Sequence, residues 1–173
     1  RDIDAVLDRL LPFRPDPESR LMEAVRYATL SGGKRIRPFL VMASSNLFGV
    51  SRPFAERVAA AIEMVHCYSL IHDDLPAMDN DDLRRGLPTC HVKFDEATAI
   101  LAGDALLARA FEVIGEAQTH SDPRVRADLV VELAKAAGGD GMVGGQVLDL
   151  LAAEVPLQIA EITRMQRMKT GAL

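Results

Sequence analysis

One apolar stretch, residues 58–71, leads almost directly into a pair of aspartates, Asp73 and Asp74. Its alanine, valine, isoleucine and methionine side chains leave few polar positions, so a helix formed here is apolar around most of its circumference. Such a helix needs other helices around it. The chain is therefore expected to fold around this segment, and the two acids are expected to leave the core at its end, where a function must offset their desolvation.

Helical periodicity covers nearly the whole chain, and apolar residues other than aromatic ones dominate the composition. Asp122 is expected to cap a helix that begins at Pro123. No strand pair is expected. The pattern predicts helices near residues 2–11, 18–30, 37–48, 54–75, 94–117, 123–138, 141–152 and 156–173. The prediction is a single all-α domain, residues 1–173, built as an antiparallel helical bundle.

Charge, hydropathy and cysteine usage exclude several classes of partner. The net charge of -5 argues against nucleic acid, which needs a broad basic surface. Asp104 and Arg109 interrupt the best candidate for a membrane span, so no stable membrane insertion is expected. Cys67 and Cys90 have no CxxC spacing and are expected to be reduced thiols. These observations predict a cytoplasmic protein.

The ten residues 73–82 contain five aspartates, and Arg84 and Arg85 follow them closely. Acids at this density repel one another unless a cation lies between them. Mg²⁺ prefers carboxylate oxygens and shares its shell with substrate phosphates, which arginines also grip. A solvated acidic surface is the simpler alternative. A calcium loop starting at Asp79 is excluded, because its sixth residue is Arg84 and its twelfth is Cys90.

A second cluster, Gly32-Gly33-Lys34-Arg35-Ile36-Arg37-Pro38, combines two glycines with three cations. Glycine lets the backbone approach an anion closely, and proline suits the first turn of a helix whose N-terminal N–H groups attract anions. Taken alone, the cluster is equally compatible with an ordinary turn and a basic surface. Together with the acidic cluster, it predicts a Mg²⁺-diphosphate site.

These strings, in this order, resemble the trans-polyprenyl diphosphate synthase family, most closely its bacterial short-chain farnesyl diphosphate synthase (geranyltranstransferase) type. The resemblance runs from about residue 20 to the C-terminus. The matching strings are Gly33-Lys34-Arg35-Ile36-Arg37-Pro38, Asp73-Asp74-Leu75-Pro76-Ala77-Met78-Asp79, Leu83-Arg84-Arg85-Gly86, Gly144-Gly145-Gln146 with Asp149, and Lys169-Thr170-Gly171.

The resemblance implies the isoprenoid synthase fold and a prenyltransferase. Such an enzyme condenses isopentenyl diphosphate with an allylic diphosphate, dimethylallyl or geranyl, to give farnesyl diphosphate. It also implies a homodimer and about two or three Mg²⁺ ions. A second aspartate-rich motif is expected beyond Leu173, since no other Asp-Asp pair follows Asp82. The 173 residues are thus expected to be the N-terminal part of a longer enzyme, incomplete at the C-terminus and inactive alone.

The resemblance also implies a role for each matching residue. Asp73 and Asp79 are direct metal ligands, and Asp74 is a supporting acid. The groups that hold isopentenyl diphosphate are Lys34, Arg37, His66 and Arg85. Arg84 and Lys169 hold the allylic diphosphate, and Lys169, Thr170 and Gln146 form the catalytic set, with the last two facing the carbocation. Each of these residues has an ordinary structural reading when taken singly, and only the joint pattern favours the functional one.

Local geometry adds detail around the central helix. His66, Ser69 and Asp73 fall on one helix face, which predicts a polar stripe beside a cavity. Pro76 is expected to end the helix and let Asp79 return toward Asp73. By resemblance, Tyr68 forms the floor that limits the length of the prenyl chain, with Ser69 as the next candidate. His72 is left with a structural role.

Three alternatives stay open. His66 and His72-Asp73 loosely match the pattern of helical metal-dependent phosphohydrolases, although that reading leaves the two cationic clusters unexplained. The product chain could be longer, as in a geranylgeranyl diphosphate synthase. The third alternative is a non-catalytic subunit or fragment of a synthase.

Overall fold

The computed structural model describes residues 2–17, 19–154 and 157–173, and its regular structure is almost entirely helical. This confirms the predicted all-α class. Residues 18 and 156, predicted as the first residues of two helices, lie outside the described residues. The chain divides into two compact units, Arg1–Ser121 and Asp122–Leu173.

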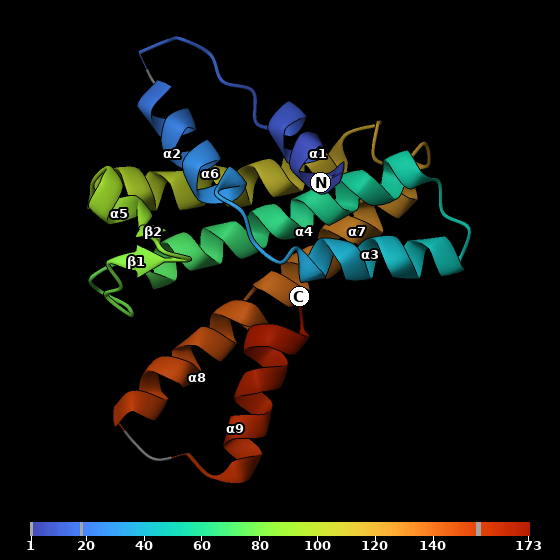
Figure 1. Cartoon of the computed structure of the whole chain (residues 1–173). Coiled ribbons are helices and arrows are strands. Elements are labelled where there is room, and N and C mark those ends of the chain that lie inside the picture. The colour runs from blue at the N-terminus through green and yellow to red at the C-terminus, as the bar shows by residue number, and fades with distance from the viewer. Residues whose placement is uncertain (1, 18, 155–156) are drawn as a thin grey trace. The chain divides into compact units, whose positions relative to one another are not determined.

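The first unit is organised around α4, which contains the apolar stretch. α4 packs mainly against α6 and α3, and α2 packs against α6. Figure 1 shows α4 and α6 running side by side, with a small hairpin near the end of α4. The helices of this unit are α1 (Asp2–Leu10), α2 (Ser19–Leu30), α3 (Ile36–Leu47), α4 (Arg52–Asp73), α5 (Cys90–Lys93) and α6 (Glu96–Gly115).

Small side chains let α4 and α6 lie close together. Ala60 and Ala61 of α4 and Ala102 of α6 are completely buried, and larger side chains such as Met64 and Leu106 fill the space between them. Burying one such large side chain stabilises the fold by about 1.5–3 kcal/mol. The prediction of a largely buried helix over this segment is therefore confirmed.

The expectation of no strand pair is wrong. β1 (Leu83–Arg84) and β2 (Leu87–Pro88) form an antiparallel pair, with Leu83 opposite Pro88 and Arg84 opposite Leu87. Arg85 and Gly86, at φ of 55° and 79°, form the two-residue turn between them, and positive φ at both positions matches the twist of a hairpin. Strands of two residues carry too little alternation to be seen in a sequence.

The second unit contains α7 (Pro123–Ala137), α8 (Met142–Glu154), α9 (Ile159–Gln166) and a π-helical turn, η1 (Arg167–Gly171). The Asp122 carboxylate accepts a hydrogen bond of 2.8 Å from the Arg124 amide, which confirms the predicted cap. α8 packs against both η1 and α9. Among the described residues, no helix combines the length and apolar character needed to cross a membrane.

Candidate active site

The acidic motif folds back on itself where α4 ends. The Asp79 amide donates to the Asp73 carbonyl at 2.8 Å, and the Asp81 amide donates to the Asp74 carbonyl at 3.2 Å. Pro76 lies in the turn between them. The return of Asp79 toward Asp73, predicted from that proline, is therefore present in the backbone.

The oxygen donors of Asp73 and Asp79 fit Mg²⁺, which commonly takes one or two protein carboxylates and completes its shell with water and substrate phosphates. Within the part of the chain that the structure describes, no group of three or more His, Cys, Asp or Glu side chains is arranged to hold a metal ion by itself.

Asp74 has a different environment from its neighbours. Only 3% of it is exposed, and both of its carboxylate oxygens accept hydrogen bonds from Arg84, with Nε at 2.9 Å from each and Nη2 at 2.5 Å from Oδ1. The hydrogen bond to Asp74 is the main cause that raises the pKa of Arg84. This bidentate pair fixes β1 to the end of α4.

The three cations of the glycine-rich cluster point to different places. Arg35 turns inward and donates to the buried Glu63 at 2.6 Å and to the Thr29 carbonyl at 2.7 Å. Burial alone would lower the pKa of Arg35, but the hydrogen bond and charge of Glu63 raise it. Arg35 also has a φ of 51° just before α3, a conformation that its hydrogen bonds hold in place. Arg35 therefore has a structural role in joining the cluster to α4.

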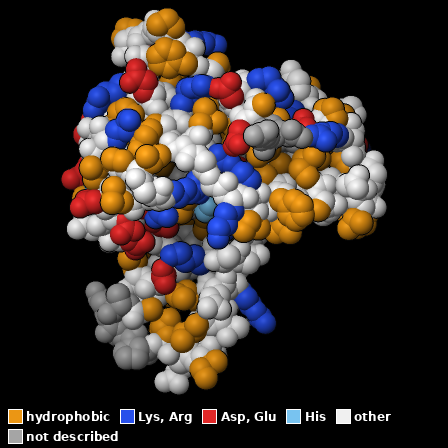
Figure 2. Space-filling model, in the orientation of Figure 1, with side chains coloured by type: hydrophobic (Ala, Val, Ile, Leu, Met, Phe, Trp, Pro, Cys, Tyr) orange, Lys and Arg blue, Asp and Glu red, His pale blue; other side chains and the backbone are white. Residues whose placement is uncertain are grey.

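An open pocket of about 440 Å³ brings together all four residues predicted to hold isopentenyl diphosphate. Its charged acid, Glu63, is already paired with Arg35, so the remaining cations dominate its lining. The Nε of Arg37 is buried without a hydrogen-bond partner, which suits a missing acceptor. The lining residues are Gly33, Lys34, Arg35, Ile36, Arg37, Glu63, His66 and Arg85. Figure 2 shows lysine and arginine side chains gathered on this face.

His66 is the neutral polar member of this pocket. Burial, followed by the charges of Arg37 and Arg85, lowers its pKa from 6.5 to about 4. The imidazole is therefore uncharged at neutral pH and can donate one hydrogen bond without adding charge. A bound diphosphate would reverse part of this effect, since an anion favours the protonated ring.

Two residues predicted to influence the prenyl chain lie along α4. Tyr68 is 9% exposed, and its ring meets that of His72 edge to face at 5.3 Å. The Ser69 hydroxyl donates to the His66 carbonyl at 2.8 Å, within the helix. The Nε2 of His72 lies 3.0 Å from the Ile100 carbonyl of α6. A side chain at Gly103 would collide with the His72 ring, because a Cβ there would lie 2.2 Å from Nε2. His72 thus joins α4 to α6.

The proposed catalytic set lies in the second unit. Lys169 forms an ion pair of 2.5 Å with Asp149. A Cβ on Gly145 would lie 2.2 Å from the Lys169 backbone nitrogen, so only glycine allows α8 to approach η1 this closely. Gln146 has a buried Nε2 without a hydrogen-bond partner, and Thr170 is exposed. π-Helical turns of this kind often mark functional sites.

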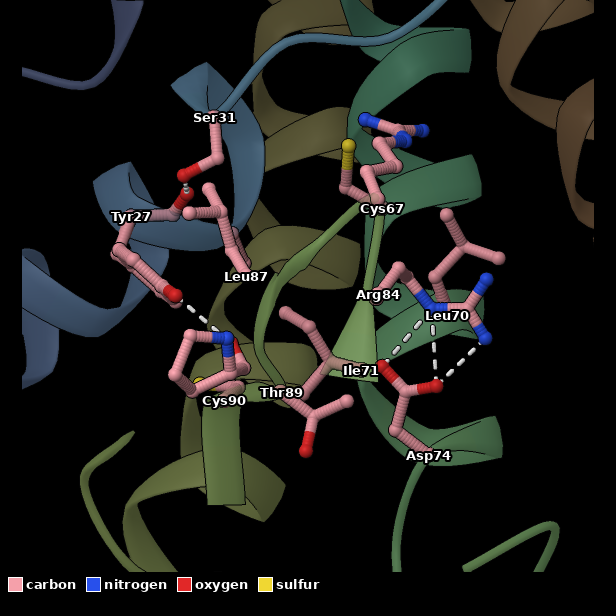
Figure 3. Close-up of a pocket in the computed structure, with 13 residues that line it drawn as sticks. Tyr27, Ser31, Cys67, Leu70, Ile71, Asp74, Arg84, Leu87, Thr89 and Cys90 are labelled. Atoms are coloured by element: carbon pink, nitrogen blue, oxygen red, sulfur yellow. Dashed lines mark hydrogen bonds and ion pairs between the residues drawn. The ribbon is translucent and has the colours of Figure 1, made fainter. Parts of the chain in front are cut away.

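A further feature was not visible in the sequence. The hairpin covers a small cavity of about 40 Å³, whose wall includes Tyr27 of α2, Asp74 and both cysteines. Figure 3 shows this cavity and the Asp74–Arg84 pair at its edge. Burial raises the pKa of Cys67 to about 12 and that of Cys90 to about 11, so both remain unreactive thiols at neutral pH. The contacts join segments far apart along the chain, which no local pattern reveals.

The geometry agrees with comparisons to known proteins. A family model described as polyprenyl synthetase matches residues 18–173. The chain belongs to the polyprenyl synthetase family.

Relatives within the polyprenyl synthetases are close in sequence. The farnesyl diphosphate synthase of Escherichia coli K12 is 54% identical over 164 residues, covering 94% of this chain and 54% of the relative. A chloroplastic geranylgeranyl pyrophosphate synthase from Catharanthus roseus is 48% identical, covering 89% of this chain and 43% of the relative. The chain thus spans about half the length of these relatives.

Solved structures of the family agree on the fold. An FPP/GFPP synthase from Zymomonas mobilis matches with a TM-score of 0.96 and 57% identity, covering 99% of this chain and 62% of that one. A geranyltransferase from Legionella pneumophila matches with a TM-score of 0.92 and 44% identity, covering 99% and 61%. The predicted isoprenoid synthase fold is confirmed.

Proposed function

We propose that the protein is a trans-prenyltransferase that joins isopentenyl diphosphate to dimethylallyl or geranyl diphosphate and yields farnesyl diphosphate. The observation that carries this proposal is the pocket shared by Lys34, Arg37, His66 and Arg85. Its cations, its neutral imidazole and the partnerless Nε of Arg37 suit a diphosphate. The names of the relatives support the same substrate class.

In this proposal the pocket holds isopentenyl diphosphate, and the acidic motif receives the allylic diphosphate. Asp73 and Asp79 hold Mg²⁺, and bound Mg²⁺ supplies Lewis-acid stabilisation of the charge on the departing diphosphate. Arg84 and Lys169 supply positive charge that orients the allylic diphosphate. The hydroxyl of Thr170 and the amide oxygen of Gln146 face the developing carbocation and stabilise it electrostatically.

The reaction breaks the allylic C–O bond and forms one C–C bond. The C–O electron pair leaves with pyrophosphate, and the double bond of isopentenyl diphosphate attacks the allylic carbocation. The tertiary cation that results loses a proton to the released pyrophosphate. Tyr68, with Ser69 behind it, sets the depth available to the prenyl chain, so a bulky tyrosine favours a product of farnesyl length.

The wider organisation is part of the same proposal. Both compact units belong to one all-α domain, the N-terminal part of a polyprenyl synthase. The enzyme is a cytoplasmic homodimer. The similarity of the matched segment to part of each farnesyl diphosphate synthase supports the first of these statements.

Product analysis tests the proposal. Full-length protein is incubated with Mg²⁺, labelled isopentenyl diphosphate and geranyl diphosphate, and both the prenyl product and the released ion are identified. Farnesyl diphosphate and pyrophosphate in equal amounts are expected. Release of inorganic phosphate without a longer prenyl chain would instead indicate a phosphohydrolase. A geranylgeranyl product would indicate a geranylgeranyl diphosphate synthase.

A further inference from the structure

The hairpin 83–88, here the arginine hairpin, carries both arginines of the candidate site. Arg84 lies in β1, and Arg85 occupies the first position of the turn. Arg85 has a φ of 55°, a conformation that costs free energy for any residue with a Cβ. The position of its guanidinium therefore depends on how firmly the rest of the hairpin is attached.

Both guanidinium groups attach the hairpin through contacts that also involve the site. Arg84 is held by Asp74, and Arg85 donates to the Gly32 carbonyl and lies against Gly33. A Cβ at Gly33 would come within 2.6 Å of Arg85 Nη1. A diphosphate in the pocket would attract the Arg85 guanidinium as well, so the contact with the Gly32 carbonyl does not by itself fix where Arg85 lies when the pocket is filled.

Another attachment does not use the site. The hydroxyl of Tyr27, from α2, donates to the Pro88 carbonyl of β2 at 2.7 Å. The Tyr27 ring is itself oriented by Phe94 at 5.8 Å, edge to face, and by the Lys93 ammonium at 4.3 Å. In Figure 3 the dashed line from the Tyr27 hydroxyl marks this hydrogen bond. Tyr27 and Gly32 thus connect the hairpin to the same end of α2.

We propose that Tyr27 is a positioning residue, whose hydroxyl holds the arginine hairpin on α2 so that Arg85 stays opposite Lys34 and Arg37 while a diphosphate is bound. The proposal rests on the proposed function of that pocket. Tyr27 is outside the pocket lining and acts only through β2. Burial, and then the charge of Cys90, raises the pKa of Tyr27, so the hydroxyl remains a donor at neutral pH.

Thr89 explains why the loss of one hydroxyl would shift the hairpin rather than unfold it. Its hydroxyl donates to the Asp81 carbonyl at 2.8 Å, and its amide donates to the Asp82 carbonyl at 2.9 Å. These bonds and the Asp74–Arg84 pair keep the base of the hairpin in place. Without the Tyr27 bond, the hairpin is expected to pivot about this base and move the turn that carries Arg85.

The test compares Tyr27→Phe with Ser31→Ala in the full-length protein. Ser31 lies four residues after Tyr27, just beyond the end of α2 and on the same cavity wall, and its hydroxyl donates to the Tyr27 carbonyl rather than to the hairpin. Tyr27→Phe is expected to raise KM for isopentenyl diphosphate about 5-fold, the factor one neutral hydrogen bond contributes to an equilibrium. We expect kcat to change less than about 2-fold and Ser31→Ala to leave KM unchanged.

Amide hydrogen exchange supplies a readout that does not depend on turnover. Amides of residues 83–87 are expected to exchange at least about 5-fold faster in Tyr27→Phe, with those of α4 unchanged. Unchanged exchange in the hairpin would overturn the proposal, whatever the substrate proves to be. An equal rise in KM for Ser31→Ala would also overturn it, because the effect would then belong to α2 as a whole. If the wild-type protein does not use isopentenyl diphosphate, the proposed function is wrong. The exchange measurement still shows whether the Tyr27 hydroxyl holds the arginine hairpin.

Discussion

At the scale of single residues, charged side chains that are neighbours in the sequence have different partners in the structure. Lys34, Arg35 and Arg37 all border the open pocket, but the guanidinium of Arg35 is paired there with buried Glu63. Asp74, beside Asp73, is committed to Arg84. Sequence patterns identified both clusters but could not separate their members, because burial of one charge depends on which distant side chain faces it.

His66 gives the protein a pH-dependent stability. Burial, and then Arg37 and Arg85, lowers its pKa to about 4 in the folded protein, whereas the unfolded value is near 6.5. Between these pH values the unfolded chain binds more protons than the folded one. The contribution of His66 to stability is therefore fully present above pH 6.5 and is lost as the pH falls toward 4. The expected contribution is roughly 2 kcal/mol after allowance for partial exposure.

Urea unfolding of the full-length protein without substrate, at several pH values, measures this term. His66→Gln should flatten the curve between pH 6.5 and 4 relative to wild type. His91→Gln serves as the control, since His91 lies outside the pocket. Parallel curves for wild type and His66→Gln would show that the imidazole does not titrate as described.

Tyr68 is the residue through which product length can be tested. It is almost completely buried on α4, five residues before Asp73. Tyr68→Ala removes most of the proposed floor, and products are expected to lengthen by at least one isoprene unit. Tyr68→Phe keeps the ring and should keep the product. Chromatography of dephosphorylated products distinguishes the two, and an unchanged distribution in Tyr68→Ala would place the floor elsewhere.

At the scale of elements, long helices could be predicted and short pieces could not. The helix expected at 54–75 is present as α4, which begins and ends two residues earlier, and the helix expected at 94–117 is present as α6, which is shorter by two residues at each end. The arginine hairpin and α5 were missed. Their contacts come from distant segments, such as Tyr27 with Pro88, so the two-residue strands have no signal of their own.

The close approach of α8 to η1 predicts a strong effect of one added methyl group. A Cβ at Gly145 would meet the Lys169 backbone at 2.2 Å, which neither helix can relieve by rotating a side chain. Gly145→Ala is therefore expected to lower the free energy of unfolding by about 2 kcal/mol or more. At Gly139 a Cβ would meet nothing within 4 Å, so Gly139→Ala is the matched control.

Chemical denaturation of the full-length variants measures this difference. A Gly145→Ala protein as stable as Gly139→Ala would contradict the close packing of α8 and η1. If Lys169 takes part in turnover as proposed, Gly145→Ala should lower turnover as well as stability. The reason is that the contact with Gly145 sets the position of the Lys169 backbone.

At the scale of the whole molecule, the bundle brings motifs that lie far apart in sequence to one pocket. The cluster near residue 34, the middle of α4 and the turn at Arg85 meet there. The sequence motifs and the family resemblance predicted these members. The geometry that joins them includes a left-handed backbone conformation at Arg35 and a positive φ at Arg85 in the hairpin turn. This geometry follows from tertiary contacts and is visible only in the folded chain.

In the proposed enzyme Asp73 and Asp79 hold Mg²⁺ for a diphosphate substrate, and turnover measured as a function of Mg²⁺ concentration shows whether they do. Full-length wild type is compared with Asp73→Ala and with Asp82→Ala, which removes an exposed acid of the same loop. Asp73→Ala is expected to abolish Mg²⁺-dependent prenyl transfer with helical content unchanged, while Asp82→Ala keeps near wild-type turnover. Near wild-type turnover by Asp73→Ala at limiting Mg²⁺ would contradict this role of Asp73.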